Sequence, residues 1–167
     1  MSGVIDEQGY RLNVGMVVAN AEGRLLWARR RGKTHAWQFP QGGVNPGERL
    51  EEAMYRELEE ELGLVDSDVK ILAISRRFLS YRLPVAFRRK GPDSICIGQR
   101  QKWFLLRLVG GDDHVHLSHG TVTPEFDRWC WVNYDYPANH VISFKKRVYR
   151  EALKEFRNVL FPKDVAR

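Results

Sequence analysis

The chain has 167 residues, of which 43% are hydrophobic, and its formal net charge is +6. This length and composition suit one soluble domain with a hydrophobic core, and the charge favours a polyanionic partner or a generally basic surface. Two cysteines, Cys96 and Cys130, exclude a disulfide framework or a cysteine zinc site and favour a reducing cytoplasm. No apolar run is long enough for a signal peptide or a bilayer span, so we expect no membrane partner.

Two strands joined by a turn are predicted near the N-terminus. Residues 10–20 read as a strand, followed by a turn at Glu22-Gly23 and a second strand over 24–30. A basic cluster over 29–33 comes next. The cluster is either the solvated end of a hairpin or, because a glycine loop at Gly42 follows it closely, a contact for phosphate or RNA.

The stretch from residue 42 to residue 64 combines a glycine-rich loop with an amphipathic helix. Its sequence is GGVNPGERLEEAMYRELEEELGL. Apolar residues recur at spacings of three and four and form one stripe along the predicted helix: Leu50, Ala53, Met54, Leu58 and Leu62. Glu57 and Glu61 fall inside this stripe, and Glu60 lies on its edge. Arg56 is the nearby cation and is expected to point elsewhere.

Carboxylates on the core-facing side of a helix require compensation. At ~4 Å and an effective dielectric near ~20, each like-charge pair costs on the order of 4 kcal/mol. A divalent metal resolves the conflict most simply, because hard cations take several oxygen ligands. We therefore predict a metal site at Glu57, Glu60 and Glu61, which differs from an ordinary glutamate-rich surface helix in the face that carries the charges.

The loop before the helix suits phosphate chemistry. Gly42-Gly43 and Pro46-Gly47 allow the backbone to approach a ligand and then open a helix, whose free N–H groups attract anions. With Glu48 after the loop and a run that begins at Arg56-Glu57, the whole stretch resembles a complete Nudix box. The resemblance implies hydrolysis of a phosphoanhydride bond with Mg²⁺ as the cofactor, and with Mn²⁺ or Zn²⁺ as alternative ions.

Three strands and two loops are predicted after this helix. Residues 69–78 are apolar and β-prone, 99–109 begin polar and end apolar, and 121–131 enter another strand. The arginine-rich stretch 80–90 is either a mobile loop that meets nucleic acid or a solvated connection. The loop 110–120 carries three histidines that are metal ligands or, more commonly at this spacing, exposed side chains: His114, His116 and His119.

The C-terminal stretch 141–160 is predicted to form an amphipathic helix. Its apolar side comprises Val148, Ala152, Leu153, Phe156, Val159 and Leu160. Its first turn holds Lys145, Lys146 and Arg147, although cations at a helix start oppose the helix dipole. A broken local rule often marks a functional site, and positive side chains beside free N–H groups form an anion site.

Further stretches extend the resemblance to the bacterial RNA pyrophosphohydrolase family across nearly the whole chain: GYRLNVGMV, WARR, WQFPQGGVNPGE, AMYRELEEELGL, GQRQKWFLL, TPEFDRWCWV and VISFKKRVYR. The resemblance implies an α/β class and the Nudix fold, an α/β/α sandwich with a mixed β-sheet, whose topology the strand and helix pattern alone leaves open. We expect the Nudix hydrolase domain over 8–153, and the end of the C-terminal helix and a tail over 154–167.

The family resemblance also implies a reaction. Members convert the 5′-triphosphate or diphosphate end of RNA to a 5′-monophosphate, which triggers 5′-end-dependent mRNA decay. Two alternatives stay open: hydrolysis of dinucleoside polyphosphates such as diadenosine polyphosphates, and a non-catalytic RNA-binding or nucleotide-binding module. The intact carboxylate set argues against the module. An activating protein partner is also left open.

Roles for individual residues follow from the matched positions. Glu57, Glu60 and Glu61 would bind Mg²⁺, and Glu125 would add a carboxylate from across the site. Glu57 is the first choice for the general base and Glu125 the second, while Arg56 orients the glutamates. Phosphate or RNA contacts are expected from Arg11, Arg30, Gly42, Gly43, Ile142, Phe144 and Lys145.

Two local features bear on these assigned roles: the turn over 33–36 and the side chain of Phe144. The turn over 33–36 is one residue longer than in the family, and Ala36 stands where a small polar residue is expected. Phe144 has two interpretations, because its ring either stacks on a splayed base or acts as a hydrophobic staple that fixes the entry to the C-terminal helix.

Overall fold

A computed structural model describes residues 3–33, 35–88, 96–118 and 123–163. Within these ranges the strands are β1 (Tyr10–Ala19), β2 (Leu25–Arg30), β3 (Trp37–Gln38), β4 (Gln41–Gly43), β5 (Val69–Ile74), β6 (Leu79–Arg82), β7 (Gly98–Leu108) and β8 (Phe126–Val132). The α-helices of the same ranges are α1 (Leu50–Leu62), α2 (Tyr136–His140) and α3 (Lys146–Leu160). Short 3₁₀ turns are η1 (Asp66–Asp68), η2 (Val85–Phe87), η4 (Asp112–His114) and η5 (Ser143–Lys145).

The strands form one mixed sheet around the long central pair β1 and β7. These two strands run parallel, in register from Tyr10 opposite Gly98 to Ala19 opposite Arg107. The remaining described pairings are antiparallel: β2 lies between β8 and the strands β1 and β3, β4 pairs with β1, and β5 and β6 pair with β7. The predicted mixed sheet is therefore confirmed.

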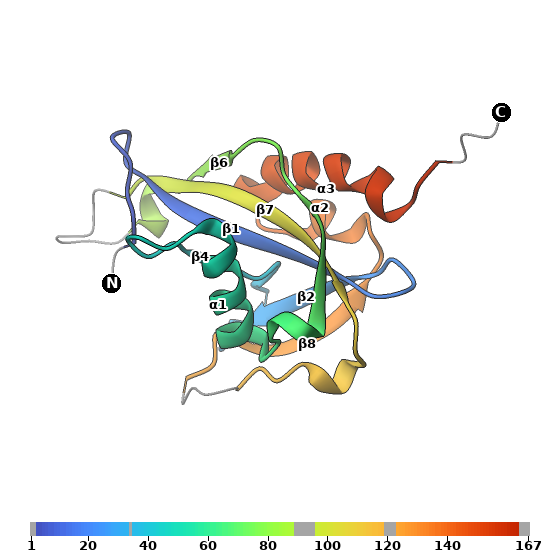
Figure 1. The fold of residues 1–167 in the computed structure, drawn as a ribbon. Helices are drawn as coiled ribbons and strands as arrows, with labels where there is room; N and C mark the ends of the chain where they lie inside the picture. The colour runs from blue at the N-terminus through green and yellow to red at the C-terminus, as the bar shows by residue number, and fades with distance from the viewer. Residues whose placement is uncertain (1–2, 34, 89–95, 119–122, 164–167) are drawn as a thin grey trace.

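Helices cover both faces of this sheet (Figure 1). Along β1, the side chains of Val14, Met16 and Val18 join a core that includes the apolar residues of α1. Those of Val17 and Ala19 join a second core that includes α3. Since successive residues of a strand point to opposite faces, one buried strand serves both cores. This arrangement confirms the expected α/β/α sandwich.

Helix α1 follows the predicted apolar stripe. Ala53, Met54, Leu58 and Leu62 are buried, and Leu50 packs against the same core. The backbone N–H of Arg49 donates to the Glu52 carboxylate (2.8 Å), so Glu52 caps the start of the helix. The helix ends at Gly63, whose φ of 70° is left-handed and suits glycine.

Residues 80–88, the described part of the stretch 80–90, contain regular structure, so its interpretation as a loop or connection throughout is wrong. Leu79 and Tyr81 point into the α3 core while Ser80 and Arg82 alternate with them, and the strand β6 pairs with β7. The turn η2 follows. The stretch is too short and too rich in arginine to stand out as a strand by its sequence, and pairing with β7 stabilises it.

The C-terminal helix is shorter than predicted. Helix α2 ends at His140, Ile142 has a non-helical backbone (φ −51°, ψ 142°), and α3 begins only at Lys146. Val159 is 44% exposed and does not belong to the buried side of α3, unlike Phe156.

Two further strands have different limits from those predicted. The strand expected over 69–78 ends at Ile74, and the strand expected over 121–131 begins at Phe126. Of the sequence features named above, residues 34, 89–90, 119–122 and 164–167 lie outside the described residues. Among the described helices, none combines the length and the apolar character that crossing a membrane requires.

Candidate active site

Helix α1 presents Glu57 and Glu61 beside the short strand β4. The Glu57 side chain is only 13% exposed, and Glu61 is 7% exposed, whereas the Glu60 side chain is 58% exposed. A Cβ atom on Gly42 would lie 2.0 Å from the carboxyl carbon of Glu57. Glycine at position 42 therefore makes room for the carboxylate that α1 places there.

Arg56 connects these glutamates to the loop. Its guanidinium donates to both carboxylate oxygens of Glu48 (2.7 and 2.9 Å), to Glu57 (2.8 Å) and to the carbonyl oxygen of Gly43 (2.8 Å). A longer contact of 3.4 Å reaches Glu60. The prediction that Arg56 points elsewhere is wrong, because its long side chain folds back along the helix. This paired arginine lowers the pKa of Glu48.

The environment of the buried glutamates opposes their negative charge. Burial raises the pKa of Glu57, and Arg56 acts against that increase. Burial also raises the pKa of Glu61 well above its usual range, and the nearby carboxylates of Glu57 and Glu125 add to the effect. The Oε1 atom of Glu61 is buried without a hydrogen-bond partner. Such an unpaired carboxylate oxygen is suited to a cation.

The donor set fits a hard divalent cation by its chemistry. All of the acidic side chains named here offer oxygen ligands, which Mg²⁺ prefers. In the arrangement that the structure describes, no group of three or more His, Cys, Asp or Glu side chains among the described residues is placed to hold a metal ion. Arg56 provides the positive charge beside Glu57 and Glu60 instead. The predicted metal site at Glu57, Glu60, Glu61 and Glu125 stays a prediction.

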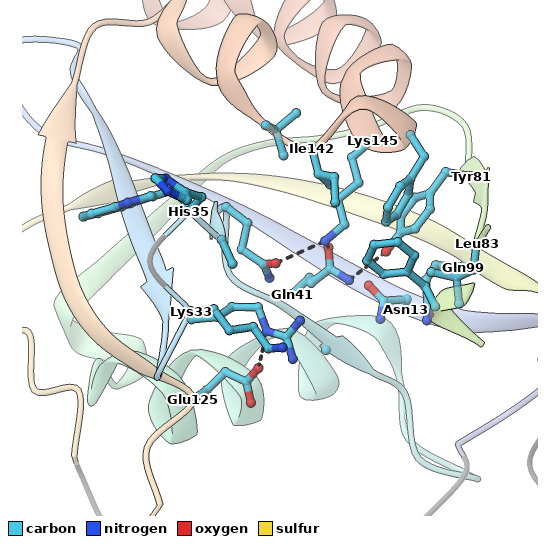
Figure 2. Close-up of a pocket in the computed structure, with 18 of the residues that line it drawn as sticks. Asn13, Lys33, His35, Gln41, Tyr81, Leu83, Gln99, Glu125, Ile142 and Lys145 are labelled. Carbon is cyan, nitrogen blue, oxygen red and sulfur yellow. Dashed lines mark hydrogen bonds and ion pairs between the residues drawn. The ribbon is translucent and has the colours of Figure 1, made fainter. Parts of the chain in front are cut away.

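Glu125 and Arg30 meet across the open side of the site. Arg30 ends β2, and Glu125 precedes β8, the antiparallel neighbour of β2. Their side chains form an ion pair with 3.6 Å between Nε and a carboxylate oxygen, and both remain roughly half exposed. Figure 2 shows Glu125 on the wall opposite Lys145. This ion pair was not predicted, since the sequence assigned Arg30 to phosphate.

A cavity of about 730 Å³ brings together most of the predicted binding residues. Eight predicted site residues line it: Arg11, Arg30, Gly42, Gly43, Glu125, Ile142, Phe144 and Lys145. Glu57, Glu60 and Glu61 do not line it, because they lie on α1 beside the Gly42–Gly43 wall. The cavity thus meets the carboxylate group at the glycines.

Lys145, the last residue of η5, lines this cavity. Its Nζ donates to Gln38 (3.1 Å) and Gln41 (3.4 Å), and the residue is buried. Burial lowers the pKa of Lys145 to about 8, and the positive charge of Arg30 adds to this effect. Of the three cations predicted to form an anion site at this helix start, Arg147 is instead bonded to the Ser80 carbonyl and to Glu151 (2.7 Å each).

Phe144 lies between two other aromatic rings. Its ring centroid is 5.7 Å from that of Tyr81 and 5.2 Å from that of Phe87. The side chain is partly buried against the α3 core and also lines the cavity. Its position is compatible with stacking on a ligand and with a role in holding η5 against β6.

Sequence reasoning missed the amide and phenol groups of the cavity. The amide and phenol side chains that line it are those of Asn13, Gln38, Gln41, Tyr81 and Gln99. The Gln41 side-chain amide donates to the hydroxyl of Tyr81 (3.0 Å), and that of Gln101 donates to Asn13 (2.9 Å). The polar residues at the start of β7 could have indicated Gln99, because a strand that begins polar and ends apolar runs from a site into the core. The very short strands β3 and β4 gave no such indication.

The described histidines of the 110–120 loop do not form a metal site. His114 pairs with Asp68, with 2.7 Å between Nδ1 and a carboxylate oxygen, and so links η4 to η1. Hydrogen bonding to Asp68 raises the pKa of His114. His116 is exposed. Of the two predicted interpretations, the exposed one describes His114 and His116.

Three features define the class of this protein: the mixed sheet, the glycine wall formed by Gly42 and Gly43, and the glutamate helix α1, which carries Glu57, Glu60 and Glu61. A family model described as NUDIX domain matches residues 9–152, and the chain belongs to this family of hydrolases. The curated relatives are more specific. Proteins named RNA pyrophosphohydrolase from Shigella boydii and Escherichia coli are 55% identical over 157 residues, which cover 94% of this chain and 88% of each relative. The family predicted from the sequence is confirmed.

Solved structures of lower identity share the fold. The Escherichia coli dihydroneopterin triphosphate pyrophosphohydrolase has a TM-score of 0.67 at 22% identity, with 88% of this chain and 96% of that chain covered. A C. elegans Ap4A hydrolase has a TM-score of 0.60 at 21% identity, with 87% of this chain and 98% of that chain covered. These likenesses support the Nudix fold of the chain.

Proposed function

We propose that this Nudix hydrolase converts the 5′-triphosphate or diphosphate end of RNA to a 5′-monophosphate and so triggers 5′-end-dependent mRNA decay. One observation carries the proposal: a single cavity joins cations, an aromatic ring and the glycine wall beside the buried carboxylates. Arg11, Arg30 and Lys145 are suited to phosphates, and Phe144 to an unpaired base. The 55% identity to RNA pyrophosphohydrolases supports the same substrate class.

A divalent metal belongs to this proposal. Nudix hydrolases generally use a divalent metal such as Mg²⁺. Glu57, Glu60, Glu61 and Glu125 would hold it, in keeping with their oxygen donors and with the unpaired Oε1 of Glu61. When bound, Mg²⁺ neutralises charge on phosphate oxygens and acidifies a water molecule.

The side chains of the chain would supply positioning and proton transfer. Glu57 is our first choice for the base that accepts a proton from the attacking water, because its raised pKa brings it closer to neutral pH. Glu125, more exposed and paired with Arg30, is the second choice. Arg56 contacts Glu48, Glu57 and the Gly43 carbonyl and therefore orients the base.

Substrate positioning falls to the cavity walls. Arg11 and Arg30 would clamp the phosphate chain, and Lys145 would meet a phosphate or a base edge from the helical side. Ile142 and Phe144 would hold the second base against the same wall. Holding the ends of the reacting group in this way contributes much of the catalysis in phosphoryl transfer.

The decisive experiment follows the phosphates released from a short 5′-triphosphorylated RNA in the presence of Mg²⁺. We expect orthophosphate or pyrophosphate release and an RNA product with a 5′-monophosphate, and we expect Glu57→Gln to lower both signals by at least ~10²-fold. Diadenosine polyphosphate is assayed in parallel. Turnover of diadenosine polyphosphate but not of RNA would show that the dinucleotide is the substrate. Turnover of neither compound would indicate a non-catalytic binding module.

A further inference from the structure

Three aromatic rings form a row from the floor of the cavity to its rim. Tyr81 is 5% exposed, Phe144 is partly buried, and Phe87 is 56% exposed. The centroids are 5.7 Å apart for Tyr81 and Phe144, and 5.2 Å apart for Phe144 and Phe87. All three residues line the cavity. The row therefore continues outward past the ring that we assign to the second base.

The position of Phe87 is fixed by the turn that carries it. The backbone N–H of Phe87 donates to the Pro84 carbonyl (2.8 Å), and the Arg88 guanidinium donates to the Leu83 carbonyl (3.0 Å). The ring leans on Phe144 with one edge and leaves more than half of its surface in solvent. A single exposed apolar residue is common on protein surfaces and needs no explanation. An exposed ring that is held in place and adjoins a cavity indicates a binding surface.

We propose that Phe87 is a stacking platform for the base of the third RNA nucleotide, which leaves the cavity after the second base has contacted Phe144. The inference rests on the proposed function and deepens it. A phenyl ring offers every base a face on which to stack, so this platform tolerates any sequence. Phe87 would bind substrate and favour RNAs of three or more nucleotides over shorter ones.

The angle between the rings defines the kind of RNA that fits. The planes of Phe87 and Phe144 are inclined by 63°. Neighbouring bases in a helix lie parallel at about 3.4 Å, so bases on these two rings cannot remain stacked on each other. The second and third nucleotides must therefore be splayed apart, as single-stranded RNA permits. An RNA base is a better occupant than a protein side chain because the row continues into the cavity that carries Lys145 and Arg30.

The test compares 5′-triphosphorylated RNAs of two, three and four nucleotides. Phe87→Ala should lower kcat/KM about tenfold on the three- and four-nucleotide RNAs and leave the two-nucleotide RNA unchanged. Phe87→Trp should keep the wild-type kcat/KM on the longer RNAs. Phe87→Leu, whose side chain is apolar but not aromatic, should show the same loss as Phe87→Ala. Val85→Ala is the matched control, since Val85 lies on the same turn, is 76% exposed and does not line the cavity. Melting curves verify that each variant is folded.

A second measurement observes the third base directly. RNA with 2-aminopurine at its third nucleotide should lose fluorescence when it binds Glu57→Gln, and should keep it with Glu57→Gln/Phe87→Ala. Equal losses of activity at every RNA length, or no loss at any length, would overturn the platform and leave Phe87 as a support for Phe144. Absence of wild-type activity on every triphosphorylated RNA would instead remove the proposed function, while the fluorescence still decides whether Phe87 contacts a base.

Discussion

Glu61 is the residue whose surroundings most strongly disfavour its charge. It is buried next to Glu57, one of its oxygens has no partner, and its pKa is raised. A carboxyl group whose pKa is higher in the folded state binds a proton more readily there than in the unfolded chain. Its contribution to stability is complete below the unfolded pKa and is lost as the pH rises through the folded pKa. At neutral pH the metal-free protein is therefore destabilised by Glu61.

The first prediction concerns this destabilisation. At pH 8, Glu61→Gln should raise the melting temperature of the metal-free protein by at least about 2 °C, because ~1 kcal/mol corresponds to about 2–4 °C in a chain of this size. Added Mg²⁺ should raise the melting temperature of the wild type and have little effect on Glu61→Gln, since binding to the folded state stabilises it. Thermal scans with and without Mg²⁺ measure both effects. A wild type that does not respond to Mg²⁺ would contradict the metal site.

Gly42 provides a second residue-scale prediction. Gly42→Ala should displace the Glu57 carboxylate and lower turnover by about 10²-fold, as Glu57→Gln should, while the melting temperature stays within a few degrees. The double variant is the control. If both changes act through the same carboxylate, Gly42→Ala/Glu57→Gln should lose no more activity than Glu57→Gln alone. If the loss in the double variant equalled the product of the two single losses, Gly42 would act independently of the Glu57 carboxylate.

Lys145 provides a pH-dependent prediction. With a pKa of about 8, its ammonium group is charged at pH 7 and mostly neutral at pH 9. Affinity for triphosphorylated RNA should therefore fall about tenfold between these values, in step with the protonated fraction. Binding of RNA to Glu57→Gln across this range provides the measurement. Lys145→Met in the same background should bind more weakly and show a flatter profile, and an unchanged slope would assign the effect to another group.

At the scale of elements, periodicity explains what the sequence could predict. Helix α1 was predictable because its apolar stripe repeats over 13 residues, and β1 because its apolar run is long. The strand β6 was not, since its four residues are too few to show a clear period and gain stability from distant contacts, namely pairing with β7 and packing in the α3 core. The two- and three-residue strands β3 and β4 carry Gln38 and Gln41 and have no period to detect.

The site shows the same division between local and long-range information. The box placed Glu57, Glu60 and Glu61 on one helix, and the family resemblance placed the cavity residues on separate segments. The bond network of Arg56 depends on its rotamer, which a helical wheel does not specify. The burial of Lys145 depends on the packing of η5 over β3, β4 and β6, which joins residues about one hundred positions apart. Patterns within one segment contain no such information.

The junction between η5 and α3 leads to a prediction about Phe144. As a stacking residue, Phe144→Ala should keep the melting temperature and lose roughly tenfold or more on triphosphorylated RNA, with little loss on a short nucleotide that does not reach the ring. As a packing residue against Tyr81 and Phe87, it should lose stability and treat both substrates alike. Activity on the two substrates, with a melting curve, distinguishes the roles. Equal losses on both would remove Phe144 from the binding site.

At the scale of the whole molecule, the charge is unevenly distributed. The formal net charge is +6, although Glu48, Glu57, Glu60, Glu61 and Glu125 concentrate negative charge at the glycine wall. The rest of the chain therefore carries a larger excess of positive charge, and Arg11, Arg30 and Lys145 bring part of it to the cavity beside these glutamates. Such a distribution attracts a polyanion to the molecule while a metal or a paired arginine compensates the acidic centre.

This distribution predicts salt-dependent binding. The affinity of Glu57→Gln for a short triphosphorylated RNA should fall with salt, with a log–log slope of about −0.7 for each phosphate contacted, or about −2 for three. Titrations between low and moderate salt determine the slope. A matching RNA with a 5′-hydroxyl is the control and should give a shallower slope. A flat profile for the triphosphorylated RNA would leave only the dinucleotide substrates.

The parallel pairing of β1 with β7 has a consequence for folding order. Paired residues such as Asn13 and Gln101 are 88 positions apart, and the pair runs through the middle of the sheet. Contacts of such long sequence separation form slowly, because a long loop must close before any of them is made. Helix α1 docks on a core that includes Phe104 and Leu106 of β7. During synthesis, the glutamate helix therefore has no complete surface to pack on until β7 has left the ribosome.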